Sequence, residues 1–479
     1  MRKREPTQPA ALVIKTRSIN FIFGCLFWWA SAGLMATALA QTRTLRIVTY
    51  NLQADTGGAT TPLPGLLAPP SDTNNVQAGG VLAGIGEEIV GNDPAQPLDI
   101  LALQETTSNP LTVAPIVSGL NSFYGVAGMY SNSSYQATES GGFVGSGNGP
   151  NALVYNTKTV QLLASVPVDP PGGTGNLGKS SGEYREVMRY QFAPAGVAPT
   201  STNEFYLYVS HYKALPSITN ETYRLGEARI IRNHAATNLP TTARILYVGD
   251  YNVTSSGEAG YLTLLSNLAP VGVAQAQGVD PMNLTARTDL NWSTDTTDTN
   301  ILMLETEAAT SLQYRDDLQL MTTNVYYGTA GGLKYVPGTY HVFGNNGTTA
   351  YYDRVDADSN TALDHRLVTN GPVFLSAAQL ELDLTYASDH LPVVADYTIP
   401  LPAPVITSYS LVGTNLVLTV ANSITGGVYT VWLTTNLAWP LTNWTAVATQ
   451  VPTVGTFTLT ATNAVNRAAP RRFYLLQGK

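Results

Sequence analysis

Short apolar segments that meet an acid, an amide or a histidine at one end constrain this chain more than any other feature. The segments are 45–53, 99–105, 151–157, 204–213, 244–252 and 391–399. Apolar runs of this length, rich in β-branched and aromatic residues, predict buried strands. A plain turn after a strand needs only small polar residues. Because ligands collect at strand ends on one side of a sheet, the pattern predicts a carboxylate-rich pocket there.

Helices are predicted between these strands, near residues 79–91 and 222–238. In the second, Leu225, Ala228 and Ile231 recur at helical spacing. Strands mixed with helices predict a layered α/β or α+β domain. Long polar loops over a rigid sheet are often functional. The loops expected here are 54–75, 128–150, 168–184 and 280–312.

A second, smaller domain is predicted after a proline-rich linker at 399–406. From Ala403 to the last residue there is no Asp or Glu, and short alternating strands follow one another. Gly426-Gly427 predicts a hairpin turn. The pattern predicts a non-catalytic β-sandwich over 401–479. The three tryptophans of this region are expected in its core, with a binding face as the alternative: Trp432, Trp439 and Trp444.

Residues 1–40 have the pattern of a signal peptide. A basic start precedes an apolar run over 19–40, and small residues, Ala38 and Ala40, stand before Gln41. A retained membrane anchor is the alternative, because the run is long enough to span a bilayer. Cleavage would leave no membrane span and would make the protein secreted, periplasmic or bound to the cell surface. It would also remove Cys25, the only cysteine, and with it any disulfide.

The charge composition limits the classes of partner. Charged residues make up 12% of the chain, the net charge is −8, and no cluster of Lys and Arg follows residue 17. Tight nucleic-acid binding depends on phosphate neutralisation by basic groups. Stable nucleic-acid binding is therefore not expected, although an enzyme that meets nucleic acid transiently remains compatible with this composition.

The polar strand ends suggest one kind of chemistry. Oxygen ligands without cysteine suit Mg²⁺, with Mn²⁺ or Ca²⁺ as alternatives. A histidine near a carboxylate can act as a base, and amides donate hydrogen bonds without adding charge. Together, a metal ion, hydrogen-bond donors and a base fit the hydrolysis of a phosphate ester by water.

The motifs that carry these groups form an ordered set: N-x-Q, L-Q-E, S-H-x-K, G-D-x-N, R-x-D and S-D-H-x-P. In this order the set resembles the endonuclease/exonuclease/phosphatase superfamily over about residues 45–400. The resemblance implies a four-layered α/β sandwich, with two packed β-sheets flanked by helices, as a catalytic domain over 41–400.

The resemblance also implies ligands for the metal ion and for the substrate. Glu105 would be the principal metal ligand, with Asn51 beside it and Asp389 close to the same ion. Gln53 lies in the first motif and would contribute to the substrate site. The segment 184–192 resembles one that sends an arginine to the phosphate, which would be Arg185. An ion pair of Arg185 with a neighbouring glutamate is the alternative.

The catalytic groups implied by the resemblance are five. His390 would be the catalytic histidine, and Asp317 the carboxylate that orients it. Asp250 and Asn252 would position the attacking water and the phosphate, and His211 would contact a phosphoryl oxygen.

Other polar residues near these motifs have simpler interpretations. Asp316 is expected to be a solvated acid, and Lys213 a surface charge. The remaining histidines match no motif and are expected to be structural: His234, His341 and His365.

The sequence therefore predicts an exported, monomeric, metal-dependent phosphoric ester hydrolase, with a nuclease or other phosphodiesterase as the first interpretation. A sphingomyelinase-like enzyme is an alternative, with the tyrosine-bearing stretch 322–343 as an exposed aromatic hairpin that contacts lipid. An inositol or sugar phosphate phosphatase is another. A non-enzymatic alternative is an inactive binding module that its C-terminal domain attaches to a surface.

Overall fold

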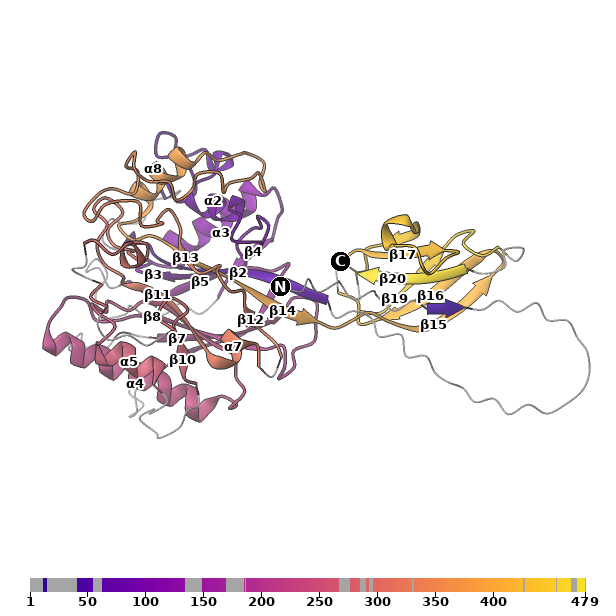
Figure 1. Ribbon diagram of the computed structural model, residues 1–479, viewed down its shortest axis with the longest axis horizontal. Coiled ribbons are helices and arrows are strands. Elements are labelled where there is room, and N and C mark those ends of the chain that lie inside the picture. Colours follow the sequence, from indigo (N-terminus) through magenta and orange to yellow (C-terminus); the bar gives the residue numbers. More distant parts are fainter. Residues whose placement is uncertain are drawn as a thin grey trace, which may run out of the picture. The chain divides into compact units, whose positions relative to one another are not determined.

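The computed structural model of this chain describes residues 12–14, 41–54, 63–133, 149–168, 185, 187–266, 276–284, 290–292, 296–329, 331–424, 427–453, 455–466 and 472–478. By its contacts the chain divides into two compact units (Figure 1). The large unit comprises Arg43–Pro194 and Pro199–Ile399, and the small unit comprises Met1–Thr42, Ala195–Ala198 and Pro400–Lys479.

One sheet of the large unit has seven strands. Their order is β12-β14-β2-β3-β5-β4, and β13 also pairs with β14. β2 and β3 run parallel, and β3 is buried along its whole length, as its unbroken apolar run predicts. The strands are β2 (Gln41–Asn51), β3 (Ile100–Gln104), β4 (Tyr130–Asn132), β5 (Ala152–Asn156), β12 (Lys334–Tyr335), β13 (His341–Val342) and β14 (Val393–Leu401).

The other sheet of the large unit has six strands in the order β10-β11-β9-β8-β7-β6. β8 and β9 run parallel, and β11 is antiparallel to β9. The strands are β6 (Val160–Val168), β7 (Val187–Pro194), β8 (Phe205–His211), β9 (Ile245–Asp250), β10 (Gly278–Val279) and β11 (Asp317–Thr322).

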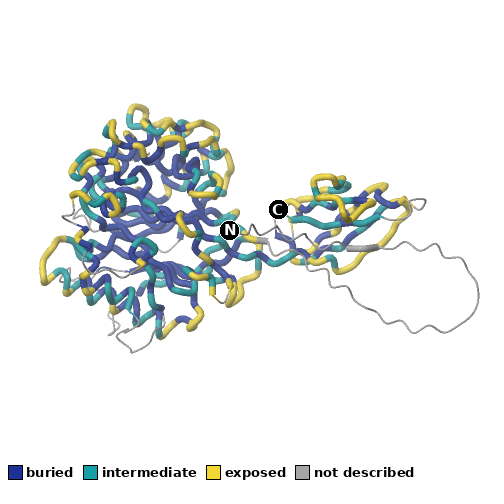
Figure 2. The backbone as a smooth tube through the Cα atoms, in the orientation of Figure 1, coloured by how far each residue is buried: buried dark blue, intermediate teal, exposed yellow. Residues whose placement is uncertain are grey.

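The two sheets pack face to face around one hydrophobic core, in which Ile47 and Leu101 of one sheet meet Val209 and Val248 of the other. Helices α2, α3 and α8 lie over the seven-stranded sheet, and α4 and α5 cover the six-stranded one (Figure 1). The buried residues of Figure 2 fill the layers between them. This arrangement confirms the predicted four-layered sandwich. The helices are α2 (Val81–Glu87), α3 (Ala114–Phe123), α4 (Ile218–Asn238), α5 (Ala259–Leu265), α6 (Thr299–Leu302), α7 (Thr323–Tyr327) and α8 (Ala377–Ala387), with short helical turns η1 (Val76–Ala78), η2 (Asn109–Val113) and η3 (Leu441–Asn443).

The sequence reading located α2 and α4 but missed α3 and α8. α8 begins at Ser376, whose side chain accepts a hydrogen bond from the backbone N–H of Gln379. Serine followed three residues later by glutamine is a capping-box pattern, and it was a usable signal for this helix. α3 carries Pro115 in its first turn and Gly119 within it, which weaken a helix prediction made from propensity alone.

Asp99 gives the large unit a pH-dependent element of stability. The carboxylate accepts a 2.7 Å hydrogen bond from the backbone N–H of Arg46, but burial raises its pKa to about 7 from 3.8. The folded state therefore favours the protonated form of Asp99. The contribution of Asp99 to the free energy of unfolding is complete below the pKa of the unfolded state and is lost as the pH rises through about 7.

We expect Asp99→Asn to remove this loss, because asparagine cannot ionise. The free energy of unfolding, measured by urea titration, should match the parent near pH 4 and exceed it at pH 8 by on the order of 3 kcal/mol. A constant difference between the two proteins across this pH range would contradict the prediction.

The small unit confirms the predicted β-sandwich. Two small antiparallel sheets, β1-β20-β17-β18 and β15-β16-β19, share one hydrophobic core. The tryptophan prediction was wrong, since none of the three belongs to that core and Trp439 is 46% exposed. The predicted turn at Gly426 falls outside the described residues. The strands are β1 (Leu12–Ile14), β15 (Val405–Val412), β16 (Asn415–Ala421), β17 (Tyr429–Thr434), β18 (Thr445–Gln450), β19 (Phe457–Ala461) and β20 (Arg472–Gly478).

Of the predicted signal peptide, the structure describes only β1, which pairs with β20. The apolar run and the expected cleavage site lie outside the described residues. Within the described part of the chain, no helix is both long and apolar enough to cross a membrane.

Candidate active site

Strand register brings the polar strand ends of both sheets together. In the six-stranded sheet His211, Asp250 and Asp317 stand side by side, because His211 pairs with Asp250 and Asp250 pairs with Asp317. In the seven-stranded sheet Asn51 pairs with Gln104, the residue before Glu105. The polar strand ends of the two sheets are in contact, because the side-chain amide of Asn51 donates to Glu105 at 3.1 Å and to Asp250 at 3.0 Å.

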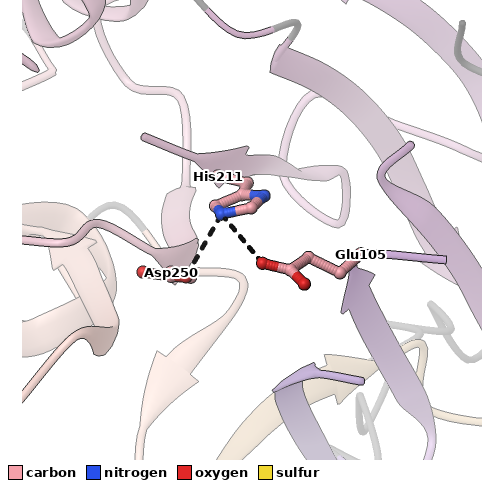
Figure 3. Close-up of side chains that lie close together, drawn as sticks. All are labelled: Glu105, His211 and Asp250. Carbon is pink, nitrogen blue, oxygen red and sulfur yellow. Dashed lines mark ion pairs between the residues drawn. The ribbon is translucent and has the colours of Figure 1, made fainter. Parts of the chain in front are cut away.

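Glu105, His211 and Asp250 form a buried cluster, called here the carboxylate–imidazole cluster. His211 Nε2 lies 3.4 Å from Glu105 Oε1 and 3.4 Å from Asp250 Oδ2. Figure 3 shows the imidazole directed at both carboxylates from its own strand end. The sequence assigned these residues to separate roles, and the structure places them around one point.

Burial sets the protonation of this cluster. It lowers the pKa of His211 well below 6.5, and the nearby Arg185 and His390 lower it further. His211 is therefore neutral and can offer Nε2 as a lone pair or as an N–H donor. Burial also raises the pKa of Asp250 to about 6, against the attraction of His390. A cation bound between these groups would offset this burial cost.

The two asparagines hold carboxylates of the site through their side-chain amides. Asn51 Oδ1 accepts a hydrogen bond from the backbone N–H of Gln53, so the amide presents its NH₂ group to the two carboxylates. Asn252 donates its side-chain amide to Asp250 Oδ1 at 2.8 Å and to the Tyr212 carbonyl at 3.2 Å. Both residues therefore position carboxylates in this structure.

Gly249 explains why a glycine precedes Asp250. Its φ is +139°, and an added Cβ would lie 2.0 Å from the Ser210 carbonyl oxygen on the neighbouring strand. A side chain there would push β8 and β9 apart at the residue before the cluster. The glycine thus allows His211 and Asp250 to stand next to each other.

His390 and Asp317 form the second part of the site. Asp317 Oδ2 lies 2.7 Å from His390 Nδ1, and Asp317 is fully buried. Burial disfavours the imidazolium, but the charge and hydrogen bond of Asp317, followed by Asp250 and Asp389, outweigh it and raise the pKa of His390 well above 6.5. Because Nδ1 is engaged, Nε2 is the nitrogen through which His390 can exchange a proton.

Backbone contacts hold this pair in place. Ser388 Oγ accepts the backbone N–H of His390 at 3.1 Å and donates to the Asn51 carbonyl at 2.7 Å. Thr306 Oγ1 accepts the backbone N–H groups of both Asp316 and Asp317 at 3.1 Å. The histidine and its carboxylate are thereby tied to both sheets.

Asp389 and Gln53 lie together beside His390. Gln53 Nε2 donates to Asp389 Oδ2, and His390 Nε2 lies 3.9 Å from Asp389 Oδ1. Burial, opposed by His390, raises the pKa of Asp389. The Glu307 carboxylate joins Asp389 and His390 to form a second potential ligand group.

The prediction for Asp316 was wrong. Asp316 is only 6% exposed, and burial followed by the neighbouring Glu307 raises its pKa well above 3.8. Adjacent acids in a sequence suggest a solvated turn, but the fold buries Asp316.

Arg185 is buried close to the carboxylate–imidazole cluster, and its charge contributes to the lowered pKa of His211. Its backbone N–H donates to Glu227 Oε1 at 2.8 Å. Glu227 Oε2 accepts the backbone N–H of Lys213 at 3.1 Å. Glu227, a buried residue of α4, therefore holds Arg185 next to the end of β8.

We expect Glu227→Ala to lower kcat/KM by about 10²-fold, because small displacements of positioning groups cost about this much. The measurement is steady-state hydrolysis of a phosphodiester, with thermal unfolding checked in parallel. Glu221→Ala, on the first turn of the same helix, is the matched control. Unchanged kinetics in a folded Glu227→Ala protein would exclude this positioning role.

Four residues of the site were missed by the sequence reading: Thr306, Glu307, Ser388 and Glu227. Ser388 lies inside the S-D-H-x-P motif and could have been assigned from it. The other three act through contacts between segments distant in sequence, which no local pattern reveals.

The donor set fits a divalent cation. The ligand atoms of Glu105, His211 and Asp250 lie within 4.8 Å of one another. Carboxylate oxygens suit Mg²⁺, Mn²⁺ and Ca²⁺, and an imidazole extends the range toward other transition metals. The described chain thus has acidic and histidine groups that could hold a metal ion.

The fold and site together define a class: an α/β sandwich with buried carboxylates and two histidines at strand ends of both sheets. No family model matches the chain, and no curated protein matches it. Similar solved structures include proteins titled as endonuclease/exonuclease/phosphatases, the superfamily that the motifs resemble.

Three of these structures illustrate the similarity. An endonuclease/exonuclease/phosphatase from Beutenbergia cavernae is 14% identical, with 91% of this chain and 96% of that chain covered and a TM-score of 0.35. The human Nocturnin catalytic domain with bound sulfate is 13% identical to this chain. The match covers 75% of this chain and 97% of that chain, with a TM-score of 0.37. ANGEL2, titled a 2′,3′-cyclic phosphatase, is 14% identical to this chain. The match covers 75% of this chain and 98% of that chain, with a TM-score of 0.38.

Proposed function

We propose that this chain is a divalent-metal-dependent phosphoric ester hydrolase, a phosphodiesterase that takes nucleic acid as a transient substrate. One observation carries the proposal: the Asp317–His390 pair stands beside the buried carboxylate–imidazole cluster. The Asp317–His390 pair can move a proton, and the carboxylate–imidazole cluster can hold a cation and a phosphoryl group. The ordered motifs that resemble the endonuclease/exonuclease/phosphatase superfamily support it.

The residues have distinct roles in this proposal. A metal ion held by Glu105, Asp250 and His211 would supply positive charge that stabilises the phosphoryl oxygens in the transition state. His390 Nε2 accepts a proton from the attacking water as the new P–O bond forms and the ester P–O bond breaks. Asp317 fixes the tautomer of His390 and stabilises the imidazolium that results. Arg185 adds positive charge near the phosphate.

The lipid alternative receives less support. Stretch 322–343 contains α7, β12 and β13, and both Tyr335 and Tyr340 are only 4% exposed. Of its described tyrosines, only Tyr327 is largely exposed, at 64%. The exposed aromatic hairpin expected of a sphingomyelinase-like enzyme is therefore absent from this described stretch. Export, a monomeric state and the exact substrate remain predictions.

Hydrolysis of supercoiled plasmid DNA tests the proposal. The purified protein is assayed with Mg²⁺ or Mn²⁺, and with excess chelator, beside His390→Ala. Metal-dependent nicking that disappears in the variant supports a nuclease. If folded protein with metal hydrolyses neither plasmid nor a panel of lipid and sugar phosphates, the non-enzymatic alternative replaces this proposal.

A further inference from the structure

A cluster of tyrosines adjoins the catalytic histidine, and backbone pairing places it there. Glu307 stands opposite His390 on one side and opposite Tyr314 on the other, through two antiparallel bridges. The Leu391 N–H donates to the Thr306 carbonyl at 2.7 Å, and the Tyr314 N–H donates to the Glu307 carbonyl at 3.0 Å. Directly opposed residues place their side chains on the same face of paired strands. The side chains of Tyr314 and His390 therefore lie on the same face as that of Glu307.

A second loop brings Tyr352 to the same place. The Tyr352 N–H donates to the Leu312 carbonyl at 2.8 Å, and the Leu312 N–H returns a 2.8 Å bond to the Asp353 carbonyl. In the same hairpin, the Ala309 N–H donates to the Asp389 carbonyl at 2.7 Å. The segment 309–312 is thus hydrogen-bonded on one side to the Tyr352 loop and on the other to Asp389.

The tyrosine side chains contact one another. The rings of Tyr351 and Tyr352 pack edge to face, with centroids 4.3 Å apart at 73°. Burial and a hydrogen bond with the Tyr352 side chain are among the causes that raise the pKa of Tyr314. Tyr352 is 59% exposed and has a positive φ of 65°, which is uncommon for a bulky residue. We call Tyr314, Tyr351 and Tyr352 the tyrosine platform.

We propose that the tyrosine platform binds a nucleobase of the substrate by stacking, next to the phosphate that is cleaved. The inference rests on the proposed function and names its substrate class. An exposed ring held beside the reacting groups offers a flat apolar surface, and every nucleobase has a π-face that can stack on an aromatic side chain.

Charge favours a base over the phosphate backbone as the platform's ligand. Acids whose charges act on the platform include Glu305, beside Tyr351, and Glu307, beside Tyr314. These acids repel phosphates, and the chain as a whole has a net charge of −8. Binding energy that a basic groove would supply in other nucleases must then come from another source, and base stacking is independent of charge.

Two substrates that share a leaving group test the inference. p-Nitrophenyl thymidine 5′-phosphate carries a base, and methyl p-nitrophenyl phosphate does not. The measured quantity is the ratio of their kcat/KM values. We expect Tyr352→Ala to lower this ratio about tenfold while the methyl ester is hydrolysed at the parent rate. Tyr352→Phe should keep the ratio, because it keeps the ring.

Tyr327→Ala is the matched control. Tyr327 is 64% exposed and belongs to α7, which follows the far end of β11 from Asp317. A ratio that is unchanged in Tyr352→Ala, or that falls equally in Tyr352→Phe, overturns the inference.

A binding measurement separates this inference from the proposed function. Oligothymidylate is titrated into parent and Tyr352→Ala protein in the presence of chelator, so that no hydrolysis is required. Weaker binding by the variant supports the platform even if the protein hydrolyses neither ester, in which case the proposed activity fails by itself. Equal binding, or none by the parent, overturns the platform.

Discussion

Glu105→Gln is expected to abolish metal-dependent hydrolysis and metal-dependent stabilisation together. The substitution keeps the volume of the side chain but removes one of the two carboxylates that face His211. Loss of residues that merely support metal ligands costs about 10–100-fold in affinity or activity, so loss of a ligand should cost at least about 10²-fold.

Two measurements check this expectation. The first is activity across a titration of Mg²⁺ and Mn²⁺. The second is the melting temperature with and without each ion, because a ligand that binds only the folded state raises it. The parent should be stabilised by the ion and Glu105→Gln should not. Glu221→Gln, on the first turn of α4, removes a carboxylate that is not in the cluster and should behave as the parent. If Glu105→Gln retains the parent's melting shift, Glu105 is not a ligand.

His390→Ala is expected to lower kcat by about 10³-fold at saturating metal, because general-base catalysis contributes about 10²–10⁴-fold. Unlike Glu105→Gln, it should keep the metal-dependent rise in melting temperature, since His390 lies outside the carboxylate–imidazole cluster. Asp317→Asn should also lower kcat strongly, because its amide cannot hold the His390 tautomer through a charged hydrogen bond. Near-parent kcat in His390→Ala would exclude it as the base.

The pH profile separates the role of Asp317 from a structural one. A base must be neutral, so activity should rise with pH through the pKa of His390, which the neighbouring carboxylates raise above 6.5. Asp317→Asn removes the largest of the raising influences. In Asp317→Asn, the rise of kcat/KM with pH should therefore occur at lower pH than in the parent, although the maximal kcat/KM is also lower. If kcat/KM rises at the same pH in Asp317→Asn as in the parent, Asp317 does not act through the protonation of His390.

The strands, and the polar residues at their ends, were readable from sequence because their signals are local. An apolar run such as 244–252 predicts a strand within ten residues, and Gly249 before Asp250 marks the close approach of a neighbouring strand. The ordered motifs then supplied the fold, since two packed sheets with helices on both outer faces is what the resemblance implied. α8 could also have been found from its capping box.

Only the tertiary structure decided how these residues act on one another. Asn51 contacts Glu105 and Asp250, which are 54 and 199 residues away, and His390 meets Asp317 across 73 residues. Burial of Asp316 and the site positions of Glu307 and Glu227 follow from such long-range contacts. Sequence determined which groups stand at strand ends, because the apolar run that marks a strand is a local signal. The fold decided their partners and protonation, because burial and electrostatic fields depend on every segment packed nearby.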